Sequence, residues 1–241
     1  MIEKIYKKVE PNLGEYNQRL KDMTPQEMLI WGYEEFDNQF AITTSFGIQS
    51  SVLLNMVSES SLQKKIKIFW IDTGYLPPET YHYAEKLIND LSLEIEVLQS
   101  ELSPARMESL YGKLWETNKA NDLDKYHELR KIKPLEKGLK KSNIQCWASG
   151  VRSSQTENRN KMKFLEVIRK RMSLRPLLNW TTKDIFYYMK ENNLPAHALY
   201  VKGFSTVGDW HSSAPDSIDK QGRATRFGGV KQECGIHNNN N

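Results

Sequence analysis

The C-terminal end of the chain carries its most distinctive chemistry. The segment KQECGIHNNNN, residues 231–241, contains Cys234, one of two cysteines among 241 residues. A thiol at this place has little to pack against, so we interpret it as chemical rather than structural, because its thiolate form is a nucleophile. Cys146 is the contrasting case, since it lies in the apolar stretch NIQCWASG, and we predict a buried and unreactive thiol there.

Two segments supply positive charge that suits an anion. GVRSSQTENRNK places Arg152 and Arg159 after a predicted strand, and GRATRFGGVK places Arg223, Arg226 and Lys231 just before the thiol. The planar guanidinium group matches phosphate and sulfate oxygens, and a lysine adds a point charge. Scattered surface arginines are common, but glycines and a thiol beside them favour an anion site.

Two predicted strand ends carry residues typical of nucleotide sites. TTSFGIQSS connects a strand to a helix, so its backbone N–H groups and the helix dipole are suited to an anion. It lacks the Gly-Lys-Ser/Thr ending of a Walker loop. The second strand end, IDTG, contains Asp72 and Gly74, and the glycine permits close approach of a ligand. The alternatives are an ordinary polar turn at the first place and a helix cap at Asp72.

These residues must be positioned by regular elements, and the hydrophobic pattern predicts strands that alternate with helices. The expected strands are residues 39–47, 65–72, 93–100 and 144–150, and the expected helices are residues 24–36, 48–59, 78–91, 133–141 and 181–193. Such alternation indicates an α/β fold: an open, mainly parallel sheet with helices on both faces. Ligands bind such sheets at the carboxyl ends of the strands.

Regular periodicity fades after Leu194, where Gly, Ser, Asp and Arg dominate up to Cys234. A stretch this long without regular structure is typical of a functional segment. We therefore expect a nucleotide-binding domain over residues 1–200, including its N-terminal helices. A flexible C-terminal arm over residues 201–241 would carry the thiol.

Composition narrows the class of protein. Hydrophobic residues make up 39% of the chain and charged residues 27%, which is ordinary for a soluble domain. A net charge of +4 is too small to indicate nucleic acid, and no apolar run is long enough to span a membrane. The start of the sequence has no apolar segment of the signal-peptide kind. Two distant cysteines form neither a disulfide framework nor a zinc site, so we expect no metal and a cytoplasmic location.

Taken together and in order, these motifs resemble one family, the thioredoxin-dependent phosphoadenylyl-sulfate (PAPS) reductases of assimilatory sulfate reduction. That family shares the fold of the adenine nucleotide alpha-hydrolase, or PP-loop, proteins. TTSFGIQSS is similar to its modified PP-loop, IDTG to a strand end, WASGVRSSQTENR to its arginine loop, and KPLEKGL to the segment before that loop. LRPLLNWTTKDIFYYMKENNLPAH, GFSTVGDWHSS and the terminal ECGIH complete the match, which runs from about Tyr33 to His237.

The related adenylyl-sulfate (APS) reductases hold a four-iron cluster through two cysteine pairs. The resemblance places Tyr126 and His127 at the first pair, and Asp209 and Ser212 at the second. An iron–sulfur cluster needs thiolates, so no bound cofactor is expected. The missing cysteines point to PAPS, with its additional 3′-phosphate, as the substrate.

The resemblance also implies a reaction and a site. Cys234 would attack the sulfonyl sulfur, leaving an S-sulfocysteine and adenosine 3′,5′-bisphosphate, and reduced thioredoxin or glutaredoxin would then release sulfite. The cations expected around the sulfonate are Arg152, Arg159, Arg223 and Arg226, with Lys133 and Lys231 as further candidates. Ser45, Gly47, Ser50 and Ser51 are expected at the phosphates, Asp72 and Gly74 on the adenosine side, and His211 and His237 either at the substrate or ordering the arm.

Three alternatives remain open at this point. One is an APS reductase that works without a cluster. A second is a PP-loop nucleotidyl transferase or pyrophosphatase that consumes ATP, although Phe46 and Gln49 replace the Gly and Asp of the usual loop. A third is a non-catalytic nucleotide-binding protein. The family resemblance also leaves room for a homodimer.

Overall fold

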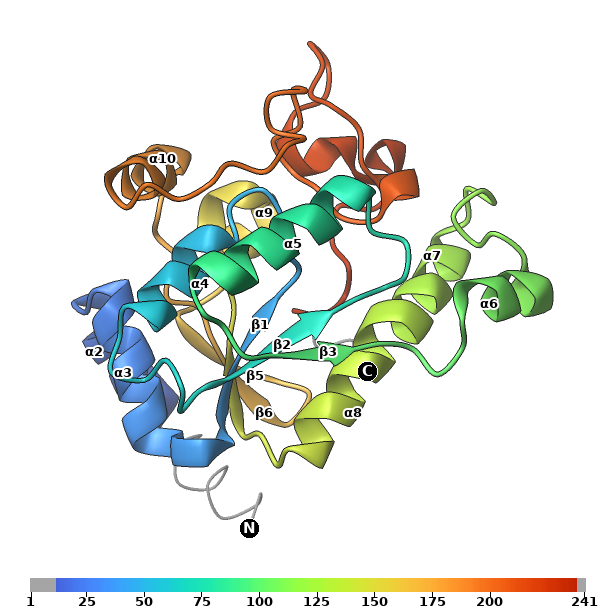
Figure 1. Cartoon of the computed structure of the whole chain (residues 1–241). Helices are drawn as coiled ribbons and strands as arrows, with labels where there is room; N and C mark the ends of the chain where they lie inside the picture. Colours follow the sequence, from blue (N-terminus) through green and yellow to red (C-terminus); the bar gives the residue numbers. More distant parts are fainter. Residues whose placement is uncertain (1–11, 238–241) are drawn as a thin grey trace.

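Six strands form one sheet at the centre of the computed structural model, which describes residues 12–237 (Figure 1). The strands are β1 (Phe40–Thr44), β2 (Lys67–Ile71), β3 (Ile95–Leu98), β4 (Cys146–Ala148), β5 (Leu165–Ile168) and β6 (Arg171–Leu174). Their order across the sheet is β3-β2-β1-β4-β6-β5. Every neighbouring pair is parallel except β5 with β6. The predicted open and mainly parallel α/β sheet is therefore confirmed.

Helices cover both faces of this sheet. They are α2 (Leu13–Lys21), α3 (Pro25–Phe36), α4 (Ser51–Ser58), α5 (Pro78–Asp90), α6 (Pro104–Tyr111), α7 (Ala120–His127), α8 (Lys133–Lys141), α9 (Glu157–Asn160) and α10 (Thr182–Glu191). Short helical turns are η2 (Asp37–Gln39), η3 (Glu128–Ile132), η4 (Ser153–Gln155), η5 (Trp210–Ser212) and η6 (Gly222–Gly229). No helix within residues 12–237 combines the length and apolarity needed to cross a bilayer.

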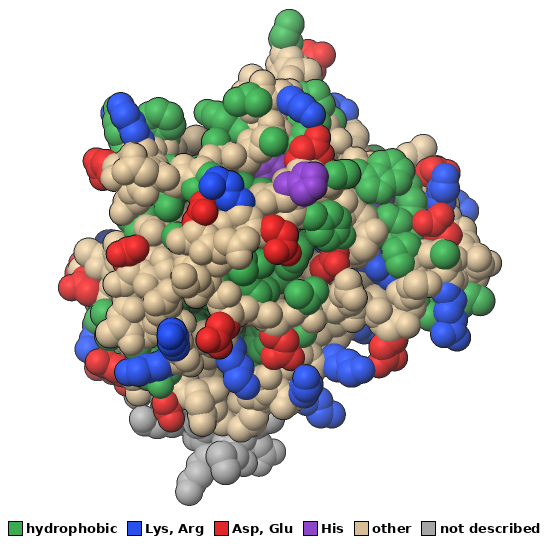
Figure 2. All heavy atoms as spheres, in the orientation of Figure 1, with side chains coloured by type: hydrophobic (Ala, Val, Ile, Leu, Met, Phe, Trp, Pro, Cys, Tyr) green, Lys and Arg blue, Asp and Glu red, His purple; other side chains and the backbone are tan. Residues whose placement is uncertain are grey.

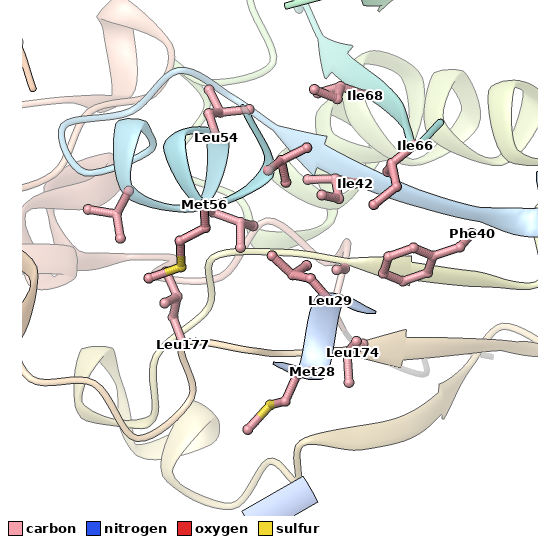
Figure 3. Packing of buried hydrophobic residues seen from close by; sticks show 14 of the residues in the cluster. Met28, Leu29, Phe40, Ile42, Leu54, Met56, Ile66, Ile68, Leu174 and Leu177 are labelled. Carbon is pink, nitrogen blue, oxygen red and sulfur yellow. The ribbon is translucent and has the colours of Figure 1, made fainter. Parts of the chain in front are cut away.

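Alternation along the strands divides the core into two layers. Phe40 and Ile42 of β1 belong to the larger cluster, together with side chains of α3, α4, α5 and α10. Ala41, between them, belongs to the second cluster, which includes side chains of α8. Figure 3 shows Met28 from α3 and Leu54 from α4 gathered on the same side of the sheet as Phe40 and Ile42. Burial of these apolar side chains fixes which face of each strand points to which helices.

Local signals place the helix starts. Thr24 accepts a hydrogen bond from the Glu27 amide, and the Glu27 carboxylate accepts one from the Thr24 amide. Thr181 and Asp184 form the same reciprocal pair at the start of α10. Both capping boxes satisfy N–H groups that otherwise have no helical partner, so both helices begin where the sequence predicts.

Within residues 201–237 the C-terminal arm contains no regular element beyond short helical turns, yet it is packed against the domain, which differs from the expectation of a flexible arm. It contains η5 and η6, and it buries Arg226, Glu233 and Ile236. Ile236 joins the second core cluster beside Trp147 and Ile168. Figure 1 shows the red C-terminal segment descending from the arm turns toward the strands. The end of the arm thus covers part of the sheet face that α8, which contacts β2 and β3, leaves open.

Candidate active site

A cavity of about 720 Å³ lies at the carboxyl ends of the central strands. Its walls come from the loop after β1, the loop after β4, and the C-terminal arm. The predicted site residues that line it are Ser45, Gly47, Ser50, Arg152, Arg159, Arg223, Arg226, Cys234 and His237. On the face shown in Figure 2, acidic and basic side chains are interspersed, whereas the cavity gathers five cations if Lys131 is included.

The loop between β1 and α4 is a tight polar turn held by one aromatic side chain. Phe46 is fully buried and packs edge-on against Trp70 at 4.9 Å between ring centroids. Its φ of 47° lies in the left-handed region, which non-glycine residues seldom adopt, and burial of the ring keeps the backbone there. The Gly47 carbonyl accepts hydrogen bonds from both the amide and the hydroxyl of Ser50. Ser45 remains exposed at the cavity, as a ligand-facing hydroxyl would be.

Arg152 is a buried cation whose hydrogen-bond partners are neutral. Its guanidinium donates to the Gln49 side-chain carbonyl and, at 3.3 Å, to the Thr182 hydroxyl. Burial, and next the nearby Arg159, lower the pKa of Arg152 to about 10. The group therefore stays protonated at neutral pH and has no carboxylate hydrogen-bonded to it among residues 12–237. Such a group is suited to bind an anionic ligand.

Glu233 holds two arginines beside the thiol. Its carboxylate accepts hydrogen bonds from Arg159 Nε at 3.0 Å and Nη2 at 2.9 Å, and from the Thr156 hydroxyl at 2.7 Å. Arg223 Nη2 lies 3.6 Å from the same carboxylate. Burial alone would raise the pKa of Glu233, but Arg159 and Arg223 outweigh it and the pKa is lowered. The charge of Glu233 is thus directed at the arginines, which it positions.

A second buried carboxylate, Asp209, organises the opposite wall. Lys131 Nζ lies 2.6 Å from its Oδ2, and the Thr73 hydroxyl donates to its Oδ1. Burial would raise the pKa of Asp209, but Lys131 and Arg226 hold it well below its usual range. Gly208 makes this packing possible, because a Cβ there would lie 2.2 Å from Arg226 Nη2. The carboxylate therefore stays ionised; it pairs with Lys131 and attracts Arg226, whose guanidinium donates a hydrogen bond to the Ser213 hydroxyl.

Sequence reasoning missed Lys131, Asp209 and Thr73 as site residues. The resemblance places Asp209 only at a lost cysteine position, and Lys131 lies two residues before the KPLEKGL segment. Their spacing along the chain carries no signal, because the Lys131–Asp209 ion pair joins residues 78 positions apart (209 − 131). Only the fold brings them together.

Cys234 is half-buried, not the loosely packed thiol that the sequence suggested. It packs with Ile132 against the core cluster that contains Ile236. Both Arg223 and Arg226 are close enough to interact electrostatically with it. Cys146, by contrast, is fully buried, and burial raises its pKa well above the usual value. The prediction of an unreactive Cys146 thiol agrees with this environment.

Three predicted site residues near the first strand ends lie outside the cavity lining. The Asp72 carboxylate is occupied by Tyr81, Gln99 and the Gly74 amide, so it braces its own turn. Gly74 has a φ of 72°, and a Cβ there would lie 2.9 Å from Arg130. Ser51 is fully buried in the first turn of α4. Thr73 lines the cavity instead, because successive residues at a strand end point to opposite sides.

Three other candidates also lie elsewhere. Lys133 is exposed, and its Nζ lies 4.0 Å from Glu128. Lys231 forms an ion pair with Asp124. His211 stacks on Trp115 at 4.0 Å between ring centroids, and its Nε2 lies 3.1 Å from the Tyr126 hydroxyl. Each of these side chains has a partner that draws it away from the cavity.

Packed side chains occupy the positions that correspond to the cluster cysteines of the APS reductases. Tyr126 and His127 are buried, and they contact Phe227 of the arm. Burial, and next Lys131, lower the pKa of His127 to about 2, so its ring is neutral. Ser212 is also buried, and its hydroxyl donates to the Asp209 carbonyl. Within residues 12–237 no group of three or more His, Cys, Asp or Glu side chains is arranged to hold a metal ion.

Comparison with known proteins places this chain in a family. A sequence profile of the phosphoadenosine phosphosulfate reductase domain matches residues 39–215. A phosphoadenosine 5′-phosphosulfate reductase from Synechococcus sp. is 44% identical over 228 residues, covering 94% of this chain and 97% of that protein. The chain belongs to the phosphoadenosine phosphosulfate reductase family. A member from Synechocystis sp. is 41% identical over 90% of this chain and 87% of its own length.

Solved structures agree with this membership of the PAPS reductase family. The crystal structure of the Candida auris PAPS reductase in a phosphate complex aligns with a TM-score of 0.72 and 28% identity, covering 83% of this chain and 95% of that one. A Candida glabrata FMN adenylyltransferase aligns with a TM-score of 0.59 at 15% identity, covering 91% of this chain and 75% of that one. The second likeness shows a shared fold alone. It gives no support to the ATP-consuming alternative.

Proposed function

We propose that this chain reduces PAPS to sulfite and adenosine 3′,5′-bisphosphate, with Cys234 as the nucleophile. One observation carries the proposal: the cavity of a PAPS reductase family member contains a single half-buried thiol beside Arg223 and Arg226. A thiolate that approaches a polyanionic substrate needs cations around the reacting sulfonate. The two buried carboxylates keep those cations in place before the substrate arrives.

In the first step, the Cys234 thiolate forms a bond to the sulfonyl sulfur of PAPS. The bond from that sulfur to the bridging phosphate oxygen breaks, and adenosine 3′,5′-bisphosphate leaves with the electron pair. Arg223 and Arg226 favour this step by stabilising charge on the sulfonate oxygens and the leaving phosphate. The enzyme then carries S-sulfocysteine.

In the second step, a thiolate of reduced thioredoxin or glutaredoxin attacks the Cys234 sulfur. Sulfite leaves with the electron pair, and a mixed disulfide joins the two proteins. The second thiol of the reductant resolves this disulfide, so two thiols supply the two electrons that the transferred sulfur gains. No residue of this chain other than Cys234 is needed for the electron transfer. A reducing cytoplasm suits such a lone thiol.

The remaining cavity residues divide the substrate between them in this proposal. Ser45 offers its hydroxyl and Gly47 its N–H group to phosphate oxygens beside the start of α4, and Ser50 shapes this turn through its hydrogen bonds to the Gly47 carbonyl. Arg152 binds a second anionic group of the nucleotide, because its own partners are neutral. The residues outside the cavity, such as Asp72 and His211, act by bracing the loops that form it.

Substitution of each cysteine tests the proposal. Cys234→Ser should bind adenosine 3′,5′-bisphosphate normally but lose sulfite formation by about three orders of magnitude or more, because a hydroxyl is a far weaker nucleophile at neutral pH. Cys146→Ser should retain turnover, since that thiol is buried away from the cavity. Sulfite release is measured with PAPS and a thioredoxin system. Turnover by Cys234→Ser at the wild-type rate would refute the mechanism.

The same assay separates the nearest alternative. With APS in place of PAPS, we expect a much lower kcat/KM, because the 3′-phosphate is absent. Equal or faster turnover of APS would favour an APS reductase that works without a cluster.

A further inference from the structure

Arg169 lies in the two-residue turn between β5 and β6, outside the cavity lining. Both turn residues have positive φ, 46° at Arg169 and 62° at Lys170. Turns of this kind usually contain glycine, asparagine or aspartate, so two long basic side chains here are unusual. Backbone strain of this sort persists where the surrounding structure holds it, and it is typical of clamps and functional sites.

The Arg169 side chain binds the backbone on the C-terminal side of Cys234. It donates one hydrogen bond to the Gly235 carbonyl at 3.1 Å and another to the Ile236 carbonyl at 2.7 Å. Its Nε is 2.9 Å from a Glu136 oxygen, which orients the guanidinium. Glu136 is itself held by Arg171, so the clamp is anchored to α8 and β6. The Arg169 side chain thus binds the two successive carbonyls that directly follow the thiol.

Side-chain packing reinforces the clamp. Ile236 is buried in the second core cluster, and the His237 ring stacks on Trp147 at 5.2 Å between centroids. Gly235 has a φ of 76°, and a Cβ there would lie 3.1 Å from Ile132. The chain therefore turns sharply after Cys234 and inserts along the sheet. On the other side of the thiol, Glu233 is held by Arg159. Cys234 is fixed from both sides.

We propose that Arg169 is a positioning residue for Cys234, which latches the end of the arm to the sheet and so holds the thiol in the cavity. The inference rests on the proposed function, because that reaction requires the thiol in two places. Sulfonation takes place inside a cavity of about 720 Å³, which admits a nucleotide but not a folded protein. The latch must therefore close for the first step and open for the reductant.

A latch of this kind predicts that Arg169→Ala affects the two steps of the reaction differently. Loss of both carbonyl hydrogen bonds should shift the latch toward its open form by about tenfold, given typical hydrogen-bond contributions. Arg169→Ala should then also slow sulfonation of Cys234 at saturating PAPS, but by less than that factor, because the wild-type arm is mostly closed and the closed fraction falls less steeply than the open fraction rises. Release of sulfite from the sulfonated enzyme by thioredoxin should be as fast as in the wild type or faster. A merely destabilised protein would lose both steps together.

Accessibility of Cys234 gives a readout that does not depend on activity. The full-length chain is treated with a maleimide on a polymer too large to enter the cavity, and labelling of Cys234 is followed over time. We expect Arg169→Ala to be labelled about tenfold faster than the wild type, and Arg169→Lys to lie between them, because lysine can serve one carbonyl. Binding of adenosine 3′,5′-bisphosphate should be unchanged, which shows that the variant is folded.

Lys170→Ala is the matched control. It removes one positive charge from the same turn, and Lys170 is exposed. Its labelling rate and its sulfonation rate should equal those of the wild type. Equal labelling of Arg169→Ala and wild type would overturn the latch, as would equal acceleration in Lys170→Ala. If labelling differs as expected but the wild type is never sulfonated by PAPS, the proposed function fails while the latch stands.

Discussion

At the residue scale, two carboxylates arrange four of the cations of the site. Glu233 holds Arg159 and Arg223, while Asp209 holds Lys131 and lies near Arg226. Buried arginines without such partners would carry a large desolvation cost. The carboxylates thus allow positive charge to be concentrated inside a folded domain. Net attraction for an anion remains, since cations outnumber carboxylates along the cavity wall.

Removal of Asp209 tests this at a single residue. Asp209→Ala leaves Lys131 and Arg226 without their buried partner, so the free energy of unfolding should fall by about 3–5 kcal/mol. Glu101→Ala is the matched control, because the Lys137–Glu101 pair is 68% and 80% exposed. That change should cost about 0–1 kcal/mol. Urea denaturation measures both. Similar losses in the two variants would contradict the role assigned to burial.

Part of the site could be predicted from residue types alone. Cys234 and four arginines were predicted from their chemistry and from the glycines near them, and all of them line the cavity. The arginines are Arg152, Arg159, Arg223 and Arg226. Lys133 and Lys231 have the same chemistry but pair with Glu128 and Asp124 at the surface. Partners that are distant in sequence decide which cation faces the cavity. Spacing along the chain does not reveal which residues the fold brings together.

At the element scale, the strongest local signals gave the correct elements. Capping boxes and apolar stripes located α3, α4, α5, α8 and α10, and the four predicted strands correspond to β1–β4. The β5–β6 hairpin escaped prediction because its turn residues, Arg169 and Lys170, carry none of the usual turn chemistry. Helix α2 (Leu13–Lys21) was expected only in general terms, as one of the N-terminal helices without bounds.

The arm shows why periodicity alone is a poor guide to packing. Its residues lack a helical or strand repeat, yet Ile236 is buried in the cluster that includes side chains of α8, β4 and β5, and Arg226 is buried with a hydrogen bond to Ser213. Irregular backbone is held by side chains of other elements: Arg169 binds its end and Arg159 binds Glu233. Such a segment can be well packed while remaining separable from the sheet. That combination suits an arm that has to open during turnover.

At the scale of the whole molecule, buried neutral histidines make stability depend on pH. Burial lowers the pKa of His127 to about 2, and of His197 and His211 to about 4. The unfolded values lie near about 6.5, so between about pH 4 and 6.5 the unfolded chain binds more protons than the folded one. Stability conferred by these groups is therefore complete above that window and is lost as the pH falls through it.

Denaturation at several pH values checks this expectation. Between about pH 6.5 and 5, the free energy of unfolding should fall by up to about 1.4 kcal/mol per pH unit for each such histidine. His127→Leu should lessen the slope, because it removes one of the titrating rings. A leucine can replace this ring, since both of its nitrogens lack hydrogen-bond partners among the described residues. The carboxylates contribute only at lower pH, since their pKa values are depressed. An unchanged slope in His127→Leu would count against this explanation.

In the proposed mechanism, Cys234 receives the sulfonate directly from PAPS. The most direct measurement is to mix the full chain with PAPS in the absence of any reductant, digest it, and weigh its peptides by mass spectrometry. We predict a sulfonate mass increase on the peptide that contains Cys234, none on the one that contains Cys146, and loss of the adduct with release of sulfite when thioredoxin is added. An unmodified Cys234 peptide from enzyme that is active on the same PAPS would contradict the claim.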